Sequence, residues 1–231
     1  MQASLVLLKI KQRLNKIDSS DYDNIECWQA REVYNKAQLE WSRRRIEGIN
    51  QLQEGDEETK DVIDDIQVLL KPLTLKGKNH PEYFETELLP KDFFTIKRVT
   101  PLVISENCGE LTFSSKLREE ENVNDYLADY AMQPAPELQE TFHTLMGNRI
   151  RVYTNGEFKI DKIHLIYYRY PKDLDFVGCE HIDGSDSFEV DPEFKNDVVE
   201  LIIDEAASIL AGDIESANQL QITKARSNTN T

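Results

Sequence analysis

The spacing of apolar residues changes twice along this chain of 231 residues, and the two changes constrain the fold more than any other feature. In the first third, apolar residues recur every three or four positions, as on one face of a helix. From Leu73 to Pro171, β-branched and aromatic residues dominate between turn signals. The last third returns to helical spacing. This order predicts an α+β fold with an N-terminal helical hairpin, an antiparallel β-sheet section, a C-terminal helix and an extended tail.

We expect three sections: helical residues 1–72, a sheet with the C-terminal helix at residues 73–216, and an extended tail at residues 217–231. Four apolar residues at helical spacing predict a first helix that ends near Asp18: Leu7, Ile10, Leu14 and Ile17. A short helix over residues 62–70 should end at Pro72, because proline does not continue a helix.

A second helix is predicted from Asp23 to about Asn50, with Asp23 and Glu26 as reciprocal caps. This helix is rich in charge and only sparsely apolar. It is therefore interpreted either as a solvated surface helix or as one packed against other copies of itself. Three consecutive arginines, residues 43–45, spread around a helix, and they are interpreted as ion-pairing groups that face acidic neighbours.

The middle section predicts an antiparallel sheet of about four to six strands. Candidate strands cover residues 83–84, 93–104, 110–114, 140–145, 149–154 and 158–170. Asn155-Gly156 lies between two alternating segments and predicts a type I′ hairpin, because both residues tolerate positive φ. Residues 119–130 interrupt the strands as an acidic helix or a long loop.

The C-terminal helix is predicted to begin at Asp191-Pro192, a capping acid followed by proline at the first helical position. Its apolar residues recur at helical spacing up to Gly212: Phe194, Val198, Ile202, Ala206, Ile209 and Leu210. The tail that follows is polar, and few of its side chains can bury apolar surface. Such a tail needs the surface of a partner to become ordered. We therefore expect it to run along a neighbouring subunit.

Composition excludes several classes of protein. The longest uncharged apolar run, Leu5 to Leu8, is far shorter than the roughly 20 residues that span a bilayer. The N-terminus lacks the pattern of a signal peptide, so a cytoplasmic site of synthesis is expected. Three cysteines without CxxC spacing, Cys27, Cys108 and Cys179, predict reduced and mostly buried thiols. A net charge of −16 disfavours a protein that grips phosphates.

Known catalytic motifs are missing from the sequence: it holds no phosphate loop, dinucleotide fingerprint, HExxH or GxSxG. The histidines are spread over separate segments: His80, His143, His164 and His181. His164 is interpreted as a half-buried sheet residue, and a metal site at Cys179 and His181 is disfavoured. We therefore predict no enzyme, no cofactor, and no catalytic, cofactor-binding or metal-ligating residue.

The carboxylates leave one alternative open, an acidic metal-dependent hydrolase or nuclease of a phage. It requires acids that converge in a cleft with a divalent ion. The candidates are numerous: Asp64, Asp65, residues 119–121, Asp173, Asp175, Asp183 and Asp186. Their abundance weakens any single pair, because a chain this acidic places some carboxylates together anywhere.

Three segments resemble virion structural proteins of tailed bacteriophages, especially the crAss-like phages of gut Bacteroidetes. They are ELLPKDFFTIKRV at residues 87–99, NRIRVYTNGEFKIDKIHLIYYRYPKDLDF at residues 148–176, and EFKNDVVELIIDEAASILAGDIES at residues 193–216. In that group an LP.DF pattern before a strand, a Y.RYP strand and a VVELI.DEA helix recur. The resemblance spans about residues 80–216.

The resemblance implies a head-to-tail connector, or adaptor ring, beneath the portal of a virion. It implies a homo-oligomer of about twelve copies, with the portal and neighbouring tail proteins as partners, DNA passing through the channel, and no membrane. Residues 172–216 carry two basic and fourteen acidic side chains, whereas the first fifty residues carry nine basic and seven acidic. That asymmetry favours contact between unlike surfaces of neighbouring copies. The acidity itself is interpreted either as a channel wall that releases DNA or as a source of solubility.

Overall fold

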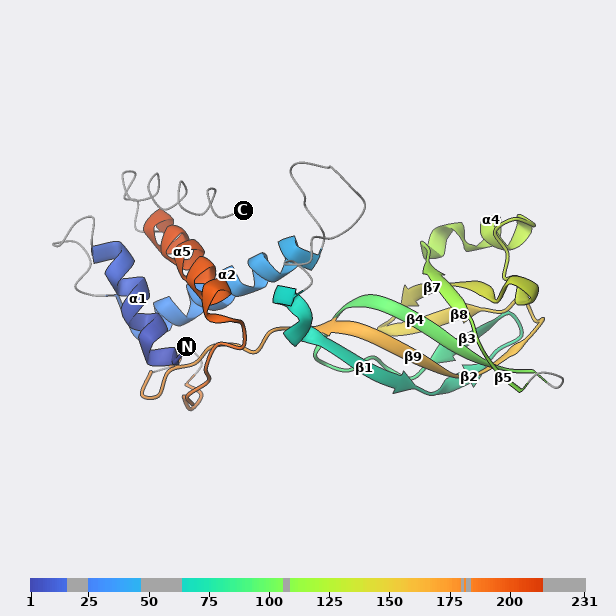
Figure 1. Cartoon of the computed structure of the whole chain (residues 1–231), viewed down its shortest axis with the longest axis horizontal. Coiled ribbons are helices and arrows are strands. Elements are labelled where there is room, and N and C mark those ends of the chain that lie inside the picture. Colours follow the sequence, from blue (N-terminus) through green and yellow to red (C-terminus); the bar gives the residue numbers. More distant parts are fainter. Residues whose placement is uncertain (16–24, 47–63, 106–108, 180, 182–183, 214–231) are drawn as a thin grey trace. The chain divides into compact units, whose positions relative to one another are not determined.

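The chain forms two compact units, one helical and one built on a sheet (Figure 1). The computed structural model describes residues 1–15, 25–46, 64–105, 109–179, 181 and 184–213. The helical unit comprises Met1–Val68 and Pro171–Thr231, and the sheet unit comprises Leu69–Tyr170. The fold is α+β, as predicted.

The division of the chain differs from the predicted one. The C-terminal helix was expected to share a section with the sheet, but it packs against the two N-terminal helices. The reason is that its apolar face matches theirs, as the buried residues below show. The predicted tail at residues 217–231 lies outside the described residues.

The long helices in the described part of the helical unit are α1 (Ala3–Asn15), α2 (Cys27–Ile46) and α5 (Asn196–Asp213). Helix α5 contacts both α1 and α2. Helix α1 buries Ala3, Val6, Ile10 and Leu14, so its apolar stripe is close to the predicted one, although Ile17 and Asp18 lie outside the described residues. None of the helices in the described part of the chain is both long and apolar enough to cross a membrane.

Helix α2 packs against other segments of its own chain, an environment that differs from both predicted ones. It has 20 described residues, and its predicted ends at Asp23 and Asn50 lie outside them. One face is buried: Ala30, Val33, Tyr34, Ala37, Gln38, Trp41 and Ser42. Small and polar residues occupy much of that face, so the apolar stripe is weak in the sequence. Trp41 packs edge-on against Phe194, with ring centroids 5.1 Å apart.

Helix α5 begins at Asn196, five residues after the predicted cap. Asp191 instead accepts a hydrogen bond from the backbone N–H of Ala3 at 2.7 Å, at the start of α1. The acid therefore caps a helix as expected, but a different one. Most of the apolar residues predicted to face the core are buried, among them Val198, Ile202, Ala206 and Leu210, whereas Ile209 is half-buried.

Ion pairs within the helical unit join basic residues near the N-terminus to acidic residues of α5. Lys9 and Arg13 of α1 pair with Glu200 of α5, and Arg13 also pairs with Asp204. Arg44 of α2 pairs with Glu205 at 3.1 Å, which agrees with the interpretation of residues 43–45. The acidic neighbours thus belong to the same chain, so this part of the asymmetry gives no support for contacts between copies.

Replacement of Tyr34 by phenylalanine should stabilise the helical unit by about 1 kcal/mol. The Tyr34 side chain is fully buried, and its hydroxyl has no hydrogen-bond partner within the described part of the chain. Burial also raises the pKa of the Tyr34 hydroxyl. Phenylalanine keeps the ring and removes the unpaired polar group. Urea denaturation of both proteins measures the change, and a loss of stability would show that the hydroxyl is bonded after all.

Within its described residues, the sheet unit contains nine strands: β1 (Leu70–Leu75), β2 (Gly77–Asn79), β3 (Tyr83–Thr86), β4 (Phe93–Ser105), β5 (Gly109–Thr112), β6 (Ser114–Leu117), β7 (Glu140–Met146), β8 (Arg149–Tyr153) and β9 (Lys159–Arg169). Their order is β1-β9-β4-β6-β7-β8-β3-β2, with β5 paired to β4. The number exceeds the predicted four to six, and β6 and β7 are parallel rather than antiparallel. The short helices η2 (Glu120–Asn122) and α4 (Val123–Ala128) fill the predicted acidic interruption, and η3 (Pro136–Leu138) follows.

The predicted helix over residues 62–70 is wrong at its C-terminal end. Helical turns end with η1 (Gln67–Leu69), and Pro72 lies inside β1, opposite Ile166 of β9. Strand β1 pairs with β9 on one side and ends the strand order. Proline is tolerated there because an edge strand leaves one row of backbone groups without a ladder partner.

The predicted hairpin at Asn155-Gly156 is also wrong, although the turn is correct. Asn155 and Gly156 have φ of 49° and 75°, and the N–H of Glu157 donates to the carbonyl of Thr154 at 3.0 Å. However, β8 pairs with β3 and β7, whereas β9 pairs with β1 and β4. The strands on either side of the turn therefore diverge. The two-residue hairpin of this region joins β7 to β8 through Gly147 and Asn148, which also have positive φ.

The sheet curls back on itself because β1 and β2 are consecutive parts of one bent strand. Strand β1 pairs with β9, and β2 pairs with β3. The Asn79 side chain completes the closure by exchanging two hydrogen bonds with the backbone of Ile160. At the bend, a Cβ on Gly77 would lie 2.1 Å from the carbonyl oxygen of Glu85, so only glycine fits. The enclosed core includes Leu75, Phe84, Val99, Val103, Phe113, Ile150, Val152, Ile163 and Leu165.

Candidate functional site

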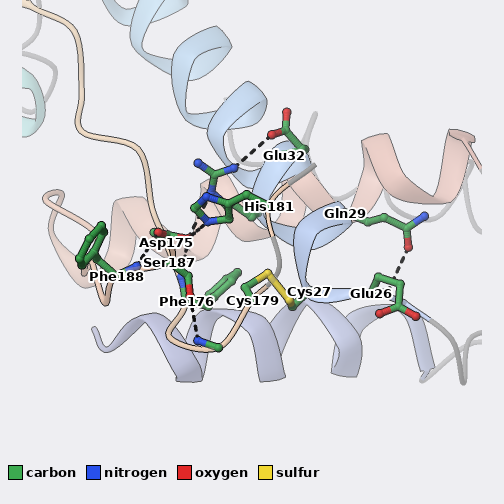
Figure 2. Close-up of a disulfide and its surroundings, with 12 residues drawn as sticks. Glu26, Cys27, Gln29, Glu32, Asp175, Phe176, Cys179, His181, Ser187 and Phe188 are labelled. Carbon is green, nitrogen blue, oxygen red and sulfur yellow. Dashed lines mark hydrogen bonds and ion pairs between the residues drawn. A yellow bond between two sulfur atoms is a disulfide. The ribbon is translucent and has the colours of Figure 1, made fainter. Parts of the chain in front are cut away.

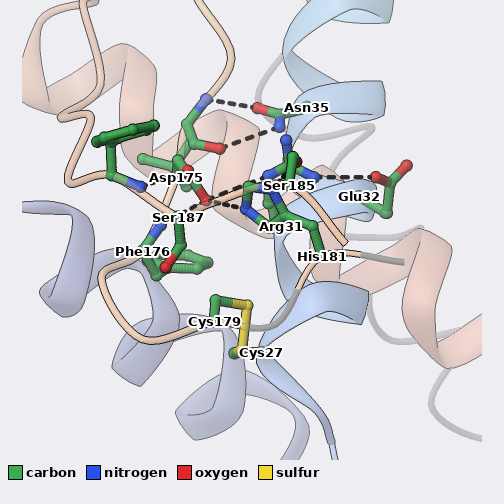
Figure 3. A network of polar contacts seen from close by, with 12 residues as sticks. Cys27, Arg31, Glu32, Asn35, Asp175, Phe176, Cys179, His181, Ser185 and Ser187 are labelled. Carbon is green, nitrogen blue, oxygen red and sulfur yellow. Dashed lines mark hydrogen bonds and ion pairs between the residues drawn. A yellow bond between two sulfur atoms is a disulfide. The ribbon is translucent and has the colours of Figure 1, made fainter. Parts of the chain in front are cut away.

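The β9–α5 loop (residues 171–195) is bonded along one face of α2 (Figure 3). The Gln38 side chain donates to the carbonyl of Lys172, and Asn35 exchanges two hydrogen bonds with the backbone of Leu174. Arg31 lies 3.3 Å from the Asp175 carboxylate, and Cys27 is bonded to Cys179. These four residues of α2 are spaced by three or four positions, which places them on one face of the helix. The loop therefore runs antiparallel to α2 and is held at each successive turn.

The disulfide between Cys27 and Cys179 corrects the prediction of three reduced thiols (Figure 2). The two cysteines are 152 positions apart, with Cα atoms 5.8 Å from each other. No sequence spacing predicts this pair, because the whole sheet unit lies between the two cysteines in the sequence. The loop then brings Cys179 to the first turn of α2. Cys108 lies outside the described residues.

Asp175 organises the loop through both of its carboxylate oxygens (Figure 3). One oxygen accepts hydrogen bonds from the N–H of Phe176 at 2.9 Å and from the ring of His181 at 2.8 Å. The other oxygen accepts from the N–H of Phe188 at 2.9 Å. The Asp175 backbone also pairs with that of Val190. One buried carboxylate thus ties together three points of the loop.

The pKa of the Asp175 carboxyl is lowered as a result. Burial alone would raise this pKa, but the N–H of Phe188, the ring of His181 and the N–H of Phe176 outweigh it by stabilising the charged form. His181 also shares a hydrogen bond of 2.7 Å with the Ser185 hydroxyl. Hydrogen bonds thus link Asp175 to His181 and His181 to Ser185, in the same order as in a hydrolase triad. Here, however, the Asp175 carboxylate also accepts hydrogen bonds from loop amides and lies next to Arg31. These contacts join separate residues of the loop.

Replacement of Asp175 by asparagine should destabilise the helical unit by about 2 kcal/mol. An amide has one oxygen, whereas donors approach both oxygens of Asp175, so one donor would face an NH₂ group. Because its pKa is lowered in the fold, Asp175 contributes stability above its unfolded pKa of ~3.9, and this contribution is lost as the pH falls through the lower folded value. Urea denaturation at pH 7 measures the loss, with exposed Asp173→Asn as the control. Equal stability of both variants would contradict the role of Asp175.

The structure does not bring the predicted carboxylate candidates together. Within the described residues, no group of three or more His, Cys, Asp or Glu side chains could hold a metal ion. Asp64 pairs with Lys195 in the helical unit, whereas Glu120 accepts hydrogen bonds from Arg151 and Tyr153 in the sheet unit. Asp183 lies outside the described residues, and Cys179 is bonded to sulfur rather than free beside His181.

The loop presents two exposed apolar side chains next to this bonded framework. Val177 is 70% exposed and Phe188 is 65% exposed. The N–H of Phe188 donates to Asp175, and the N–H of Gly178, next to Val177, donates to the Ser187 hydroxyl at 3.0 Å. Exposed carboxylates accompany them at Asp173, Asp186 and Glu189. We call these five residues the loop tip: Asp173, Val177, Asp186, Phe188 and Glu189.

The outer face of β1, β9 and β4 has the opposite charge. Two basic side chains, Arg98 of β4 and Lys162 of β9, lie on this face. Pro72, Ile166 and Arg98 are direct neighbours across the three strands, and His164 and Lys162 follow on the same face of β9. His164 is exposed and bonded to Thr74 at 3.0 Å, so the prediction of a half-buried residue is wrong. We call these five residues the outer face: Pro72, Arg98, Lys162, His164 and Ile166.

Two of the segments that carry the phage resemblance pack against each other. The Asp92 carboxylate accepts hydrogen bonds from Lys71 at 2.6 Å and from the Tyr167 hydroxyl at 3.1 Å. The backbone carbonyl of Asp92 accepts from the N–H of Tyr170 at 2.8 Å, and the rings of Phe94 and Tyr170 lie 4.6 Å apart. The LP.DF and Y.RYP patterns thus form one structural junction between β4 and β9. The third pattern lies on α5, where its Glu200 and Asp204 form ion pairs with α1.

No protein-family model matches the chain, and no curated protein is detectably similar to it.

Proposed function

We propose that this chain is a structural subunit of a phage virion, a head-to-tail connector or adaptor ring beneath the portal that lets DNA pass. The proposal rests on the resemblance of three segments and on their structural roles. Residues of all three segments make packing contacts, hydrogen bonds or ion pairs within the fold.

The difference in charge between the two units is the structural observation that supports the ring. The helical unit has 14 basic and 28 acidic side chains, whereas the sheet unit has 13 basic and 15 acidic ones. Internal ion pairs leave the net charge of the helical unit unchanged at −14, and the sheet unit has a basic outer face. Unlike surfaces on one chain favour head-to-tail contacts, which close into a ring when the rotation between neighbours allows it.

The same charge suits a channel through which DNA passes. A protein that neutralises phosphates releases counterions and gains affinity for DNA. A helical unit with a net charge of −14 repels the phosphates instead. Portal and neighbouring tail proteins would supply the flanking contacts of such a ring.

Native mass spectrometry and negative-stain microscopy of the purified chain test this proposal. We expect a closed ring of about twelve copies that dissociates at high salt, because screening weakens contacts between opposite charges. A chain that stays monomeric at every concentration would contradict the proposal. A monomer that cleaves a phosphodiester with a divalent ion would favour the hydrolase alternative.

A further inference from the structure

We propose that the loop tip of one copy binds the outer face of a second copy of this chain. This inference rests on the proposed ring and names the two surfaces that would join its subunits. It deepens the proposed function because it states which unit of each copy takes part.

The two surfaces are complementary in charge. The β9–α5 loop contains eight acidic and two basic side chains. Three of its exposed carboxylates, Asp173, Asp186 and Glu189, have no ion pair with any residue that the structure describes. The outer face offers Arg98, which is exposed and also has no ion pair among the described residues, and Lys162, whose nearest carboxylate is that of the adjacent Asp161 at 3.8 Å. Complementary potentials steer such surfaces together and exclude wrong pairings.

The two surfaces also match in their apolar parts. Val177 and Phe188 project from the loop tip, and an exposed phenylalanine is a strong anchor once a partner covers it. On the outer face, Pro72 is exposed and Ile166 is half-buried, and the two lie opposite each other in adjacent strands. Basic side chains flank this apolar pair, as carboxylates flank Phe188. An apolar centre with a charged rim is the usual anatomy of a protein interface.

Several described residues of the loop are bonded within their own chain before any partner arrives. The disulfide, the Asp175 hydrogen bonds and the contacts of Asn35 and Gln38 fix the loop to α2. Binding therefore orders little additional chain, which lowers the entropic cost of association. Because the tip and the face belong to different units of the chain, each copy offers one of each, and the contact is head-to-tail.

A charge-swap experiment tests the contact. The first variant combines Asp186→Lys with Glu189→Lys, and the second combines Arg98→Glu with Lys162→Glu. Each variant alone should lower the association constant between subunits at least about 100-fold, because like charges then meet. An equimolar mixture should assemble again into rings in which the two variants alternate, since every contact then joins opposite charges. Native mass spectrometry distinguishes the two subunits by mass.

Matched controls change the same charge elsewhere. Glu121→Lys with Glu157→Lys, and Lys36→Glu with Lys78→Glu, alter exposed residues outside both surfaces and should leave assembly unchanged. Phe188→Ala tests the apolar centre without a change of charge and should weaken association about 10-fold. Circular dichroism verifies that every variant remains folded.

The outcomes separate the inference from the proposed function. A wild-type chain that remains monomeric overturns both. A wild-type ring with a charge-reversed variant that assembles equally well overturns the inference alone, as does a mixture that stays dissociated. Loss of assembly in each variant with recovery in the mixture supports the contact between the loop tip and the outer face.

Discussion

Replacement of both Cys27 and Cys179 by serine should lower the free energy of unfolding of the helical unit by about 4 kcal/mol. The disulfide spans 152 positions, but most of them belong to the sheet unit. If the sheet unit stays folded while the helical unit unfolds, the flexible loop that the disulfide closes contains only about fifty residues. Chain-entropy estimates give about 3 kcal/mol for a 15-residue loop and about 4.7 kcal/mol for a 100-residue loop, so the expected value lies between them.

Tryptophan fluorescence measures this change selectively. The chain has two tryptophans, Trp28 and Trp41, and both lie in α2 of the helical unit. Guanidinium denaturation followed by fluorescence therefore reports on the unit that contains the disulfide. Dithiothreitol should lower the midpoint for the wild-type chain and leave the double serine variant unchanged.

Cys108→Ser is the matched control, because it removes a thiol but keeps both partners of the disulfide. This variant should lose stability on reduction, as the wild-type chain does. If dithiothreitol leaves the wild-type midpoint unchanged, the disulfide does not stabilise the helical unit.

Local conformation was predictable from the sequence, whereas the choice of partner was not. Asn155 and Gly156 adopt the positive φ values that their residue types favour. Their flanking strands nevertheless pair elsewhere, because β8 lies between β3 and β7. Turn chemistry depends on two residues, but pairing depends on how the whole sheet encloses its core. The same holds for Asp191, whose capping role was foreseen and whose helix was not.

The α2 face shows a second limit of sequence patterns. Periodicity detects a buried face only when apolar residues fill it. In α2 the buried positions include Gln38 and Ser42, and Asn35 and Gln38 serve the backbone of the β9–α5 loop. A helix that binds an extended segment needs polar side chains for the backbone of that segment. The charge-rich sequence of α2 therefore suggested an exposed helix, although one face of α2 is buried.

The candidate site could not be predicted from the sequence, because tertiary contacts bring its residues together. Cys27 and Cys179 meet where the loop lies against α2, and Asn35 and Gln38 bind the same loop. Asp175 was one acid among many in the sequence, and nothing in its neighbours marked it as the buried organiser of the loop. A spacing of three or four positions among Cys27, Arg31, Asn35 and Gln38 was the available signal, and polar residues at that spacing are common on exposed helices.

The sheet unit should lose about 3 kcal/mol of stability between pH 7 and pH 4 because of His143. The His143 side chain faces the core and is 2% exposed, and its Nε2 has no partner among the described residues. Burial lowers the pKa of His143 to about 4. Below the unfolded pKa of ~6.5, His143 binds a proton in the unfolded chain but not in the folded chain. The free energy of unfolding therefore falls as the pH decreases to about pH 4. A difference of about 2.5 pKa units corresponds to about 3 kcal/mol.

Substitution of His143 by glutamine should flatten this pH dependence, whereas His164→Gln should leave it intact, because His164 is exposed on the same sheet. Circular dichroism of the strands during urea denaturation at several pH values measures both variants. The window from pH 6.5 to pH 4.5 isolates the histidine, since the carboxyl groups of Glu85 and Asp92 have lowered pKa values and titrate below it. An NMR titration that places the His143 pKa near its ordinary value would contradict the buried neutral ring. In that case Ser115, whose hydroxyl lies 2.7 Å from His143 Nδ1, would face a charged partner that the core does not otherwise neutralise.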